Sequence, residues 1–245
     1  MSKPADYCDV RWNVVTGCTP VSAGCDHCWA RRFAKRMAGR AGYDRDDPTK
    51  PTFRDDRLGQ PLKWKKPRVI AVGFMGDLFH EAHDDDDICS AFEVMALARQ
   101  HIFLVLTKRP ERIESALYGA DGGNFLSGDD YLPNVWLGVS AEDQRTYDAR
   151  VSALLRVMEC SSGWHYWASI EPMLGPISIG LWYLDWVVVG GESGPGARYM
   201  EPDWARAVRD DCAAAGIPYY TKQMTAHAPI PEDLQVRQLP WGETG

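Results

Sequence analysis

The sequence predicts an α/β protein built as an irregular or partial (β/α) barrel of about six to seven parallel strands. Short apolar segments recur along the 245 residues, amphipathic segments lie between them, and polar residues follow the apolar segments directly. Near-continuous apolar strands that alternate with helices are typical of a parallel sheet covered by helices. The stretch between Ile170 and Asp185 is too short for a full covering helix, so we expect the barrel to be irregular.

Six segments are expected to be buried strands, because each is a short run of β-branched and aromatic residues bounded by glycine, proline or charge. They are Arg68–Phe74, Ile102–Thr107, Val135–Ser140, His165–Ile170, Asp185–Gly190 and Ile217–Thr221, and a weaker candidate, Trp12–Thr16, precedes them. Four amphipathic segments are expected to be helices: Trp29–Gly39, Asp86–Gln100, Glu142–Met158 and Pro202–Ala215. Ser140 and Asp203 lie near helix starts, and Gly216 suits a helix stop. We expect one domain over residues 1–245, with a basic loop or insertion at about 40–67.

The net charge of −7, from 27 Lys and Arg against 34 Asp and Glu, argues against a general nucleic-acid coat. Between Arg31 and Arg68, however, thirteen Lys and Arg face only five Asp and Glu. This local excess is either a phosphate-binding surface or a solvated helix and loop. No apolar run is long enough to span a bilayer, and the first residues, MSKPADYCDV, lack the apolar core of a secretion signal. We therefore expect a cytoplasmic protein without a membrane partner.

Three cysteines, Cys18, Cys25 and Cys28, form the pattern C-x6-C-x2-C in a loop rich in glycine. Their soft thiolates suit zinc or an iron–sulfur cluster, and unrelated buried thiols are the plain alternative. Structural zinc needs a fourth ligand, for which Cys8 and His27 are the local candidates. A [4Fe–4S] cluster prefers one cysteine on each iron, so three cysteines leave one iron for a non-protein ligand. S-adenosylmethionine is the familiar occupant of that position, although its usual motif is C-x3-C-x2-C.

Further blocks extend the pattern beyond the cysteine loop. WNVVTGCTPVSAGCDHCWA, FMGDLFHE, LTKRPER, LGVSAEDQ, SIEPMLGPI, DWVVVGGESGPGAR and YYTKQ follow one another between Trp12 and Gln223. In this order they resemble the blocks of a phage-associated, radical-SAM-like family of unassigned function. The resemblance implies a radical-SAM-like barrel with a [4Fe–4S] cluster on Cys18, Cys25 and Cys28. It also implies S-adenosylmethionine as cofactor, an external electron donor and formation of a 5′-deoxyadenosyl radical, chemistry that the cofactors supply.

The polar residues that follow the strands are the candidates for cofactor binding, because the carboxyl ends of parallel strands carry function in such folds. They are Met75, Gly76, Asp77, Ser140, Glu142, Glu171, Gly190, Gly191 and Glu192. Asp77 could instead cap the following turn, and Ser140 could be a helix N-cap. Glu171 could instead form a structural ion pair, with Arg198, Lys108 or Lys222 as its mate.

Four cations are expected to ring the mouth of the site: Lys108, Arg109, Arg198 and Lys222. They favour an anionic substrate, either a small molecule or a nucleic acid, and we expect modification of a nucleoside, nucleotide or nucleic acid. In HEAH, the spacing does not fit a metal site, so His80 is expected at the polar rim and His83 in solvent. A non-catalytic iron–sulfur or zinc protein that binds nucleic acid is the main alternative, and an electron-transfer module is a third.

Overall fold

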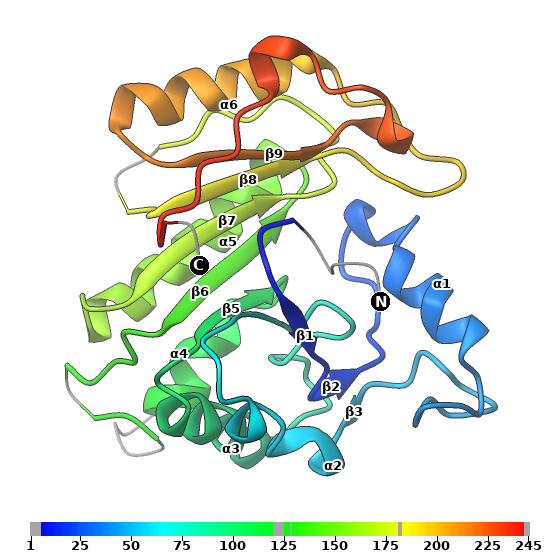
Figure 1. The fold of residues 1–245 in the computed structure, drawn as a ribbon, viewed down its shortest axis with the longest axis vertical. Helices are drawn as coiled ribbons and strands as arrows, with labels where there is room; N and C mark the ends of the chain where they lie inside the picture. Colours follow the sequence, from blue (N-terminus) through cyan, green and yellow to red (C-terminus); the bar gives the residue numbers. More distant parts are fainter. Residues whose placement is uncertain (1–5, 120–124, 128, 181–182, 243–245) are drawn as a thin grey trace.

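Seven parallel strands form one curled sheet in the computed structural model, which describes residues 6–119, 125–127, 129–180 and 183–242. The strands, in their order across the sheet, are β1 (Val10–Trp12), β4 (Val69–Val72), β5 (Ile102–Thr107), β6 (Val135–Ala141), β7 (His165–Ile170), β8 (Trp186–Gly190) and β9 (Tyr219–Gln223). Every neighbouring pair is parallel. Over the described residues no ladder joins β1 to β9, so the sheet is an open half-barrel (Figure 1). The predicted α/β class and partial (β/α) barrel are confirmed.

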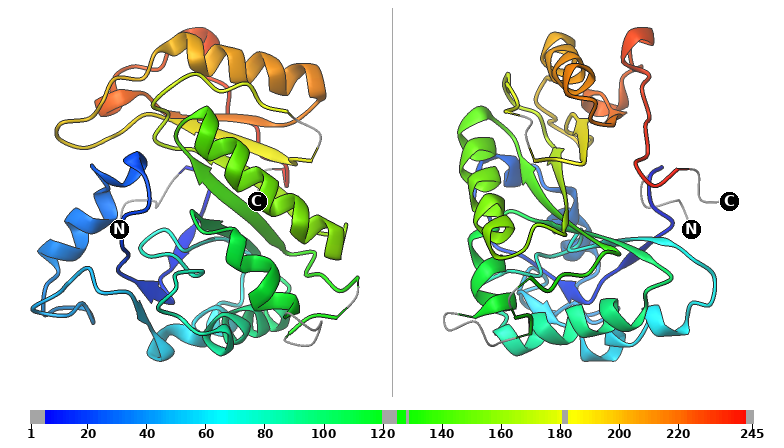
Figure 2. Two further views of the ribbon diagram at one scale, coloured as in Figure 1. Left: turned by 180° about the vertical axis from the view of Figure 1, so that it is seen from behind. Right: turned by 90° about the vertical axis from the view of Figure 1, so that its left-hand side faces the viewer.

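Four helices pack on one face of this sheet, and Figure 2 shows them from behind and from the side. They are α3 (Asp85–Leu97), α4 (Glu111–Tyr118), α5 (Gln144–Cys160) and α6 (Pro202–Ala215). The sequence pattern does not predict α4, which is only eight residues long. Helix α5 begins after Asp143, whose carboxylate accepts the Thr146 amide in a capping box. Ser140 is therefore a residue of β6 and not a helix N-cap.

The chain between β1 and β4 carries the cysteine loop and the basic segment. It contains β2 (Val15–Thr16), η1 (Ala23–Cys25), α1 (Trp29–Arg36), β3 (Thr52–Phe53), α2 (Asp55–Leu58) and η2 (Pro61–Lys63). The weak strand predicted at Trp12–Thr16 is two strands: β1 joins the main sheet, and β2 pairs antiparallel with β3. Two short 3-10 turns, η3 (Thr225–His227) and η4 (Glu232–Leu234), follow β9.

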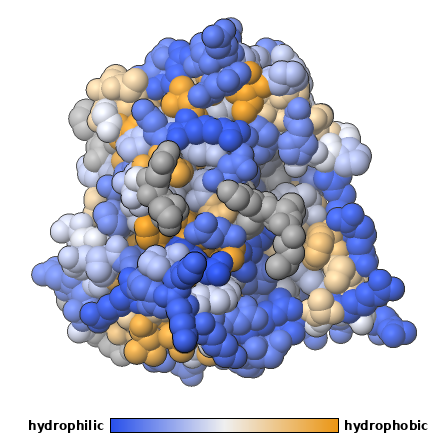
Figure 3. All heavy atoms as spheres, viewed as in Figure 1, coloured by the Kyte–Doolittle hydropathy of each residue, from blue (hydrophilic) through white to orange (hydrophobic). Residues whose placement is uncertain are grey.

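The basic segment does not form one surface. Helix α1 follows Cys28 and lies beside the carboxyl ends of the strands, whereas Lys63, Lys65 and Lys66 precede β4 and lie toward the amino ends. The two clusters therefore lie toward opposite ends of the strands. In Figure 3 many hydrophilic residues lie on the flank that α1 occupies in Figure 1.

The alternation of side chains along each strand builds two separate cores. The face under the helices is aliphatic and aromatic, with Ile70, Val105 and Leu137 fully or almost fully buried. The concave face carries an aromatic layer formed by side chains from four strands and from the two ends of the chain: Tyr7, Trp136, Trp167, Trp186, Tyr220 and Trp241. Their rings meet mostly edge to face, with centroids 5.0–6.1 Å apart. None of the described helices has the length and apolar character needed to cross a membrane.

Candidate functional site

A cavity of about 360 Å³ opens at the carboxyl ends of the strands. Its polar wall continues the alternation that builds the aromatic layer. Along β7 the inward positions are Trp167 and Ser169, and Glu171 follows directly after the strand. Along β9, Tyr220 is followed by Lys222. The strands therefore place an apolar layer deep in the half-barrel and hydrogen-bonding groups above it. Cavities of this size and mixed lining are typical of small-molecule sites.

Cys18, Cys25 and Cys28 all line this cavity. They come from the loop after β2, from η1 and from the residue that precedes α1. Two glycines fix the start of the loop. Gly17 has a φ of 78°, and a Cβ there would lie 2.1 Å from the Lys50 carbonyl oxygen. A Cβ on Gly76 would lie 2.9 Å from the Gly17 oxygen, so Gly76 lets the loop approach β4.

The two candidates for a fourth ligand lie in different places. Cys8 is 5% exposed and packs in the aromatic layer, away from the lining of the cavity. His27 does line the cavity, and its Nδ1 lies 3.1 Å from Glu192 Oε2. Within the described ranges, no three His, Cys, Asp or Glu side chains are grouped as a single metal ion requires.

Arg109 holds the first cysteine of the motif. Its Nη1 donates to Cys18 Sγ at 3.5 Å, and its Nη2 donates to Thr19 Oγ1 at 2.9 Å. Its Nε donates to Glu81 Oε2 at 2.8 Å. The Arg109 side chain is only 5% exposed, so it is a buried member of the wall rather than the mouth cation that the sequence suggested. Burial raises the pKa of the Cys18 thiol to about 11, and Asp77 adds to this effect while Arg109 opposes it.

Asp77 is fully engaged by the protein. Its carboxylate accepts four hydrogen bonds, from the Phe79 amide (3.1 Å), Thr107 Oγ1 (2.6 Å), the Lys108 amide (3.1 Å) and Arg109 Nη1 (3.3 Å). The structure thus favours the alternative in which Asp77 caps the turn after β4, and it ties that turn to the end of β5. Met75 also lines the cavity, but it packs with Ala34 and Tyr43 under α1.

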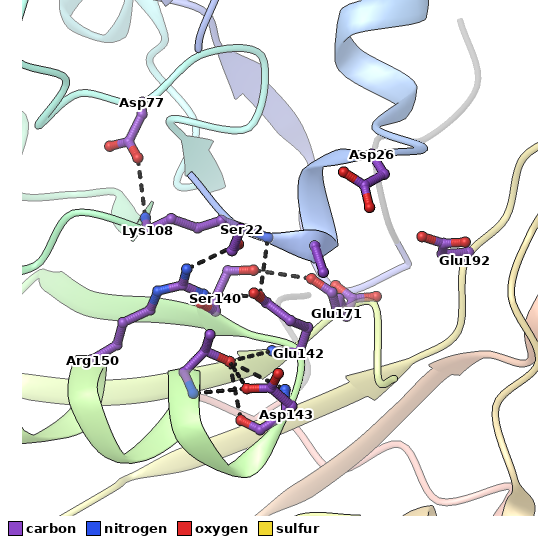
Figure 4. A network of polar contacts seen from close by, with 12 residues as sticks. Ser22, Asp26, Asp77, Lys108, Ser140, Glu142, Asp143, Arg150, Glu171 and Glu192 are labelled. Carbon is purple, nitrogen blue, oxygen red and sulfur yellow. Dashed lines mark hydrogen bonds and ion pairs between the residues drawn. The ribbon is translucent and has the colours of Figure 1, made fainter. Parts of the chain in front are cut away.

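Glu142 is not among the residues that line the cavity, and its assignment to cofactor binding stays a prediction. Its side chain is 1% exposed, and its Oε2 lies 2.9 Å from Arg150 Nη1 and 3.4 Å from Lys108 Nζ (Figure 4). Burial alone would raise the pKa of Glu142, but the two cations outweigh it and lower the pKa. A Cβ on Gly24 would lie 2.7 Å from Lys108 Nζ, so this ion cluster packs directly under the cysteine loop.

Arg198 is likewise placed outside the lining, as the partner of Glu192. Its Nε lies 3.1 Å from Glu192 Oε1, its Nη2 contacts the same oxygen, and its amide donates to Oε2 at 2.8 Å. Burial acts to raise the pKa of Glu192, but the Arg198 contacts outweigh it and lower the pKa. Arg198 Nη2 also donates to the Ala23 oxygen at 2.7 Å, which joins the loop after β8 to the cysteine loop.

Glu171 and Lys222 form the ion pair of the polar wall, with Glu171 Oε2 and Lys222 Nζ 2.9 Å apart. Of the three ion-pair partners considered for Glu171, the structure shows Lys222 in contact with it. Ser169 Oγ donates to Oε2 at 2.9 Å, and the Gln223 amide donates to Oε1 at 3.2 Å. Gly190 lies behind this pair: a Cβ there would lie 2.5 Å from Glu171 Oε1, so Gly190 makes room for the pair and does not line the cavity.

The exposure of His83 differs from that expected from the sequence. It is 3% exposed rather than in solvent, because it packs against His80 and Phe53 with ring centroids 6.0 and 6.2 Å away. Burial lowers the pKa of His83 to about 4. His80 is also buried, and its Nε2 lies 2.8 Å from Thr19 Oγ1, so it supports the cysteine loop from below.

A family model described as a protein of unknown function, DUF5131, matches residues 3–238. The chain belongs to the DUF5131 family. No curated protein and no solved structure matches it.

In this DUF5131 protein the cavity brings together thirteen of the sixteen residues that the sequence nominated, and Glu142, Gly190 and Arg198 are the three that lie outside its lining. Sequence reasoning missed Arg11, Trp29 and Ser169, which also line it. Arg11 and Ser169 are single polar residues inside apolar strands, and that interruption is the signal that marks an inward position. Trp29 is 39% exposed at the mouth, with the Arg11 guanidinium 5.0 Å from its ring centroid.

Proposed function

We propose that this DUF5131 protein is a [4Fe–4S]- and S-adenosylmethionine-dependent radical enzyme that modifies a nucleoside, nucleotide or nucleic acid. The observation that carries the proposal is that Cys18, Cys25 and Cys28 line the same cavity as the polar residues Glu171, Lys222 and Gln223. A cluster on these cysteines would share the cavity with a small molecule held by the polar residues.

The residues present fit a cluster of this kind. Thiolates are the donors that iron–sulfur clusters use, and each cysteine of such a cluster ligates its own iron. Three cysteines leave one iron of a [4Fe–4S] cluster open to a small-molecule ligand, whereas a structural zinc ion needs a fourth protein ligand. When bound, the cluster and S-adenosylmethionine would supply an electron and a carbon radical, and the protein would orient the reactants and exclude water.

The polar wall supports a substrate with hydrogen-bonding edges. Glu171, Lys222 and Gln223 present an acceptor, a cation and an amide to the cavity. Trp29, exposed at the mouth beside Arg11, is suited to stacking on a base. Helix α1 continues from Trp29 with exposed cations at Lys35 and Arg36, which favours a phosphate-bearing substrate.

Anaerobic purification and reconstitution with iron and sulfide, followed by S-adenosylmethionine and dithionite, tests the proposal. We expect a brown protein with about four irons per chain and formation of 5′-deoxyadenosine. A colourless protein with stoichiometric zinc would instead support the zinc form of the non-catalytic alternative.

Cysteine variants locate the ligands. Replacing Cys18, Cys25 or Cys28 by Ala should abolish iron uptake. Replacing Cys89, Cys160 or Cys212 by Ala removes a thiol that does not line the cavity and should leave iron uptake unchanged. Loss of the cluster in Cys8→Ala would show that the ligand set is not the three cavity cysteines.

A further inference from the structure

The guanidinium of Arg109 contacts only one of the three motif sulfurs. Its Nη1 donates to Cys18 Sγ at 3.5 Å. Among the described residues, no side-chain donor contacts the sulfur of Cys25 or Cys28. The three thiols of the motif are therefore not equivalent in this structure.

Other contacts fix the guanidinium in this orientation. Nη1 also reaches Asp77 Oδ2 at 3.3 Å, and Nη2 bonds both the Thr19 oxygen at 3.2 Å and Thr19 Oγ1 at 2.9 Å. Glu81 holds Nε at 2.8 Å. With its side chain 5% exposed, Arg109 is shielded from solvent, and its charge acts on Cys18 against the opposite charge of Asp77.

We propose that Arg109 is a positioning residue that hydrogen-bonds the Cys18 sulfur and raises the reduction potential of the metal centre that Cys18 ligates. This inference rests on the proposed function, because it requires a redox-active cluster on the cysteines. A hydrogen bond to a ligating sulfur and a nearby cation both stabilise the reduced form, which carries one more negative charge. The sequence had assigned Arg109 to the substrate, and its burial reassigns it to the cluster.

The test compares the midpoint potential of the reconstituted cluster in the wild type and in Arg109→Gln, by titration with dithionite under anaerobic conditions. We expect a lower potential in Arg109→Gln. The matched control is Arg112→Gln, which removes an equal charge from a nearby guanidinium. Arg112 contacts the His80 and His83 oxygens and Asp85, and it reaches no sulfur of any residue that the structure describes, so its loss should leave the potential unchanged.

An unchanged potential in Arg109→Gln overturns the inference, and so does an equal fall in Arg112→Gln. If Arg109→Gln takes up no iron, the midpoint potential of Arg109→Lys provides the test instead. This variant keeps the charge but loses the planar guanidinium that reaches sulfur and Thr19 together. The midpoint potential of its cluster should therefore be lower than in the wild type, and an unchanged potential overturns the inference. A wild-type protein that holds no iron–sulfur cluster refutes the proposed function itself, and the iron content measured before the titration separates the two failures.

Discussion

Lys222 Nζ lies 2.9 Å from Glu171 Oε2, directly above the aromatic layer and 5.7 Å from the ring centroid of Tyr7. The side chains are 26% and 13% exposed, so the pair is largely withdrawn from water. A carboxylate in such a place depends on its cation, because removing one partner of a withdrawn pair leaves the other without compensation.

Lys222→Met should therefore lower the free energy of unfolding of the apo protein by about 2 kcal/mol. Adding Glu171→Gln should restore much of this loss, since no charge then remains unpaired. Urea unfolding of the two single variants and the double variant measures the coupling. Lys65→Met, at an exposed lysine for which no ion pair is found in the described residues, is the control. Additive effects of the two changes would contradict the pairing.

Gly138 should not tolerate a side chain. A Cβ there would lie 2.2 Å from Trp167 Nε1, which donates to the Val105 and Trp136 oxygens at 3.2 Å. We expect Gly138→Ala to lower the free energy of unfolding by about 2–3 kcal/mol through overpacking. Gly59→Ala is the matched control, because nothing lies within 4 Å of a Cβ there and φ is −79°. Equal melting temperatures for the two variants would disprove the tight contact.

The buried His83 should make stability fall in mild acid. Its folded pKa of about 4 lies below the ordinary 6.5, so the folded state favours the neutral ring. The stabilisation is complete above pH 6.5 and is lost as the pH falls toward 4, for a total of about 3 kcal/mol. The charged or titratable groups that act on the ring are Asp77, His80, Asp84 and Arg112.

His83→Phe isolates this effect, because it keeps a ring but cannot be protonated, while other groups titrate in both proteins. Within the described part of the chain His83 Nε2 has no hydrogen-bond partner, so the substitution breaks no bond at that atom. Unfolding measured between pH 7 and 4 should show a steeper loss in the wild type than in the variant. Parallel curves would refute the prediction.

The two basic clusters should differ in nucleic-acid binding. Changing Lys35, Arg36 and Arg40 beside the cavity to Glu should weaken binding of a labelled single-stranded RNA. It should also reduce, by about two, the slope of the logarithm of the binding constant against the logarithm of the salt concentration. The control is Lys63, Lys65 and Lys66 changed to Glu, the same change in charge at the amino ends of the strands. Fluorescence anisotropy at several salt concentrations measures both. Equal weakening by the two triple variants would mean that the α1 side has no special role.

The sequence predicts the architecture well because burial on both faces imposes apolar strands, and β5 and β7 have the predicted bounds. The rim positions also follow, since parallel strands bring their carboxyl ends to one edge. What the sequence does not predict is where a rim side chain points. Glu142 pairs with Arg150 on α5, and Arg198 pairs with Glu192. These partners neutralise the charges at shorter range than a ligand at the mouth would.

The aromatic layer determines how molecules can enter and leave. Trp167 and Trp186 are fully buried, so within the described part of the chain the aromatic layer closes the half-barrel beneath the polar wall. Molecules must therefore enter and leave the cavity through the mouth beside Trp29 and His27. We expect a molecule seated near Lys222 to bind before one that occupies the mouth and to leave after it. Competition kinetics would show this as ordered rather than random binding.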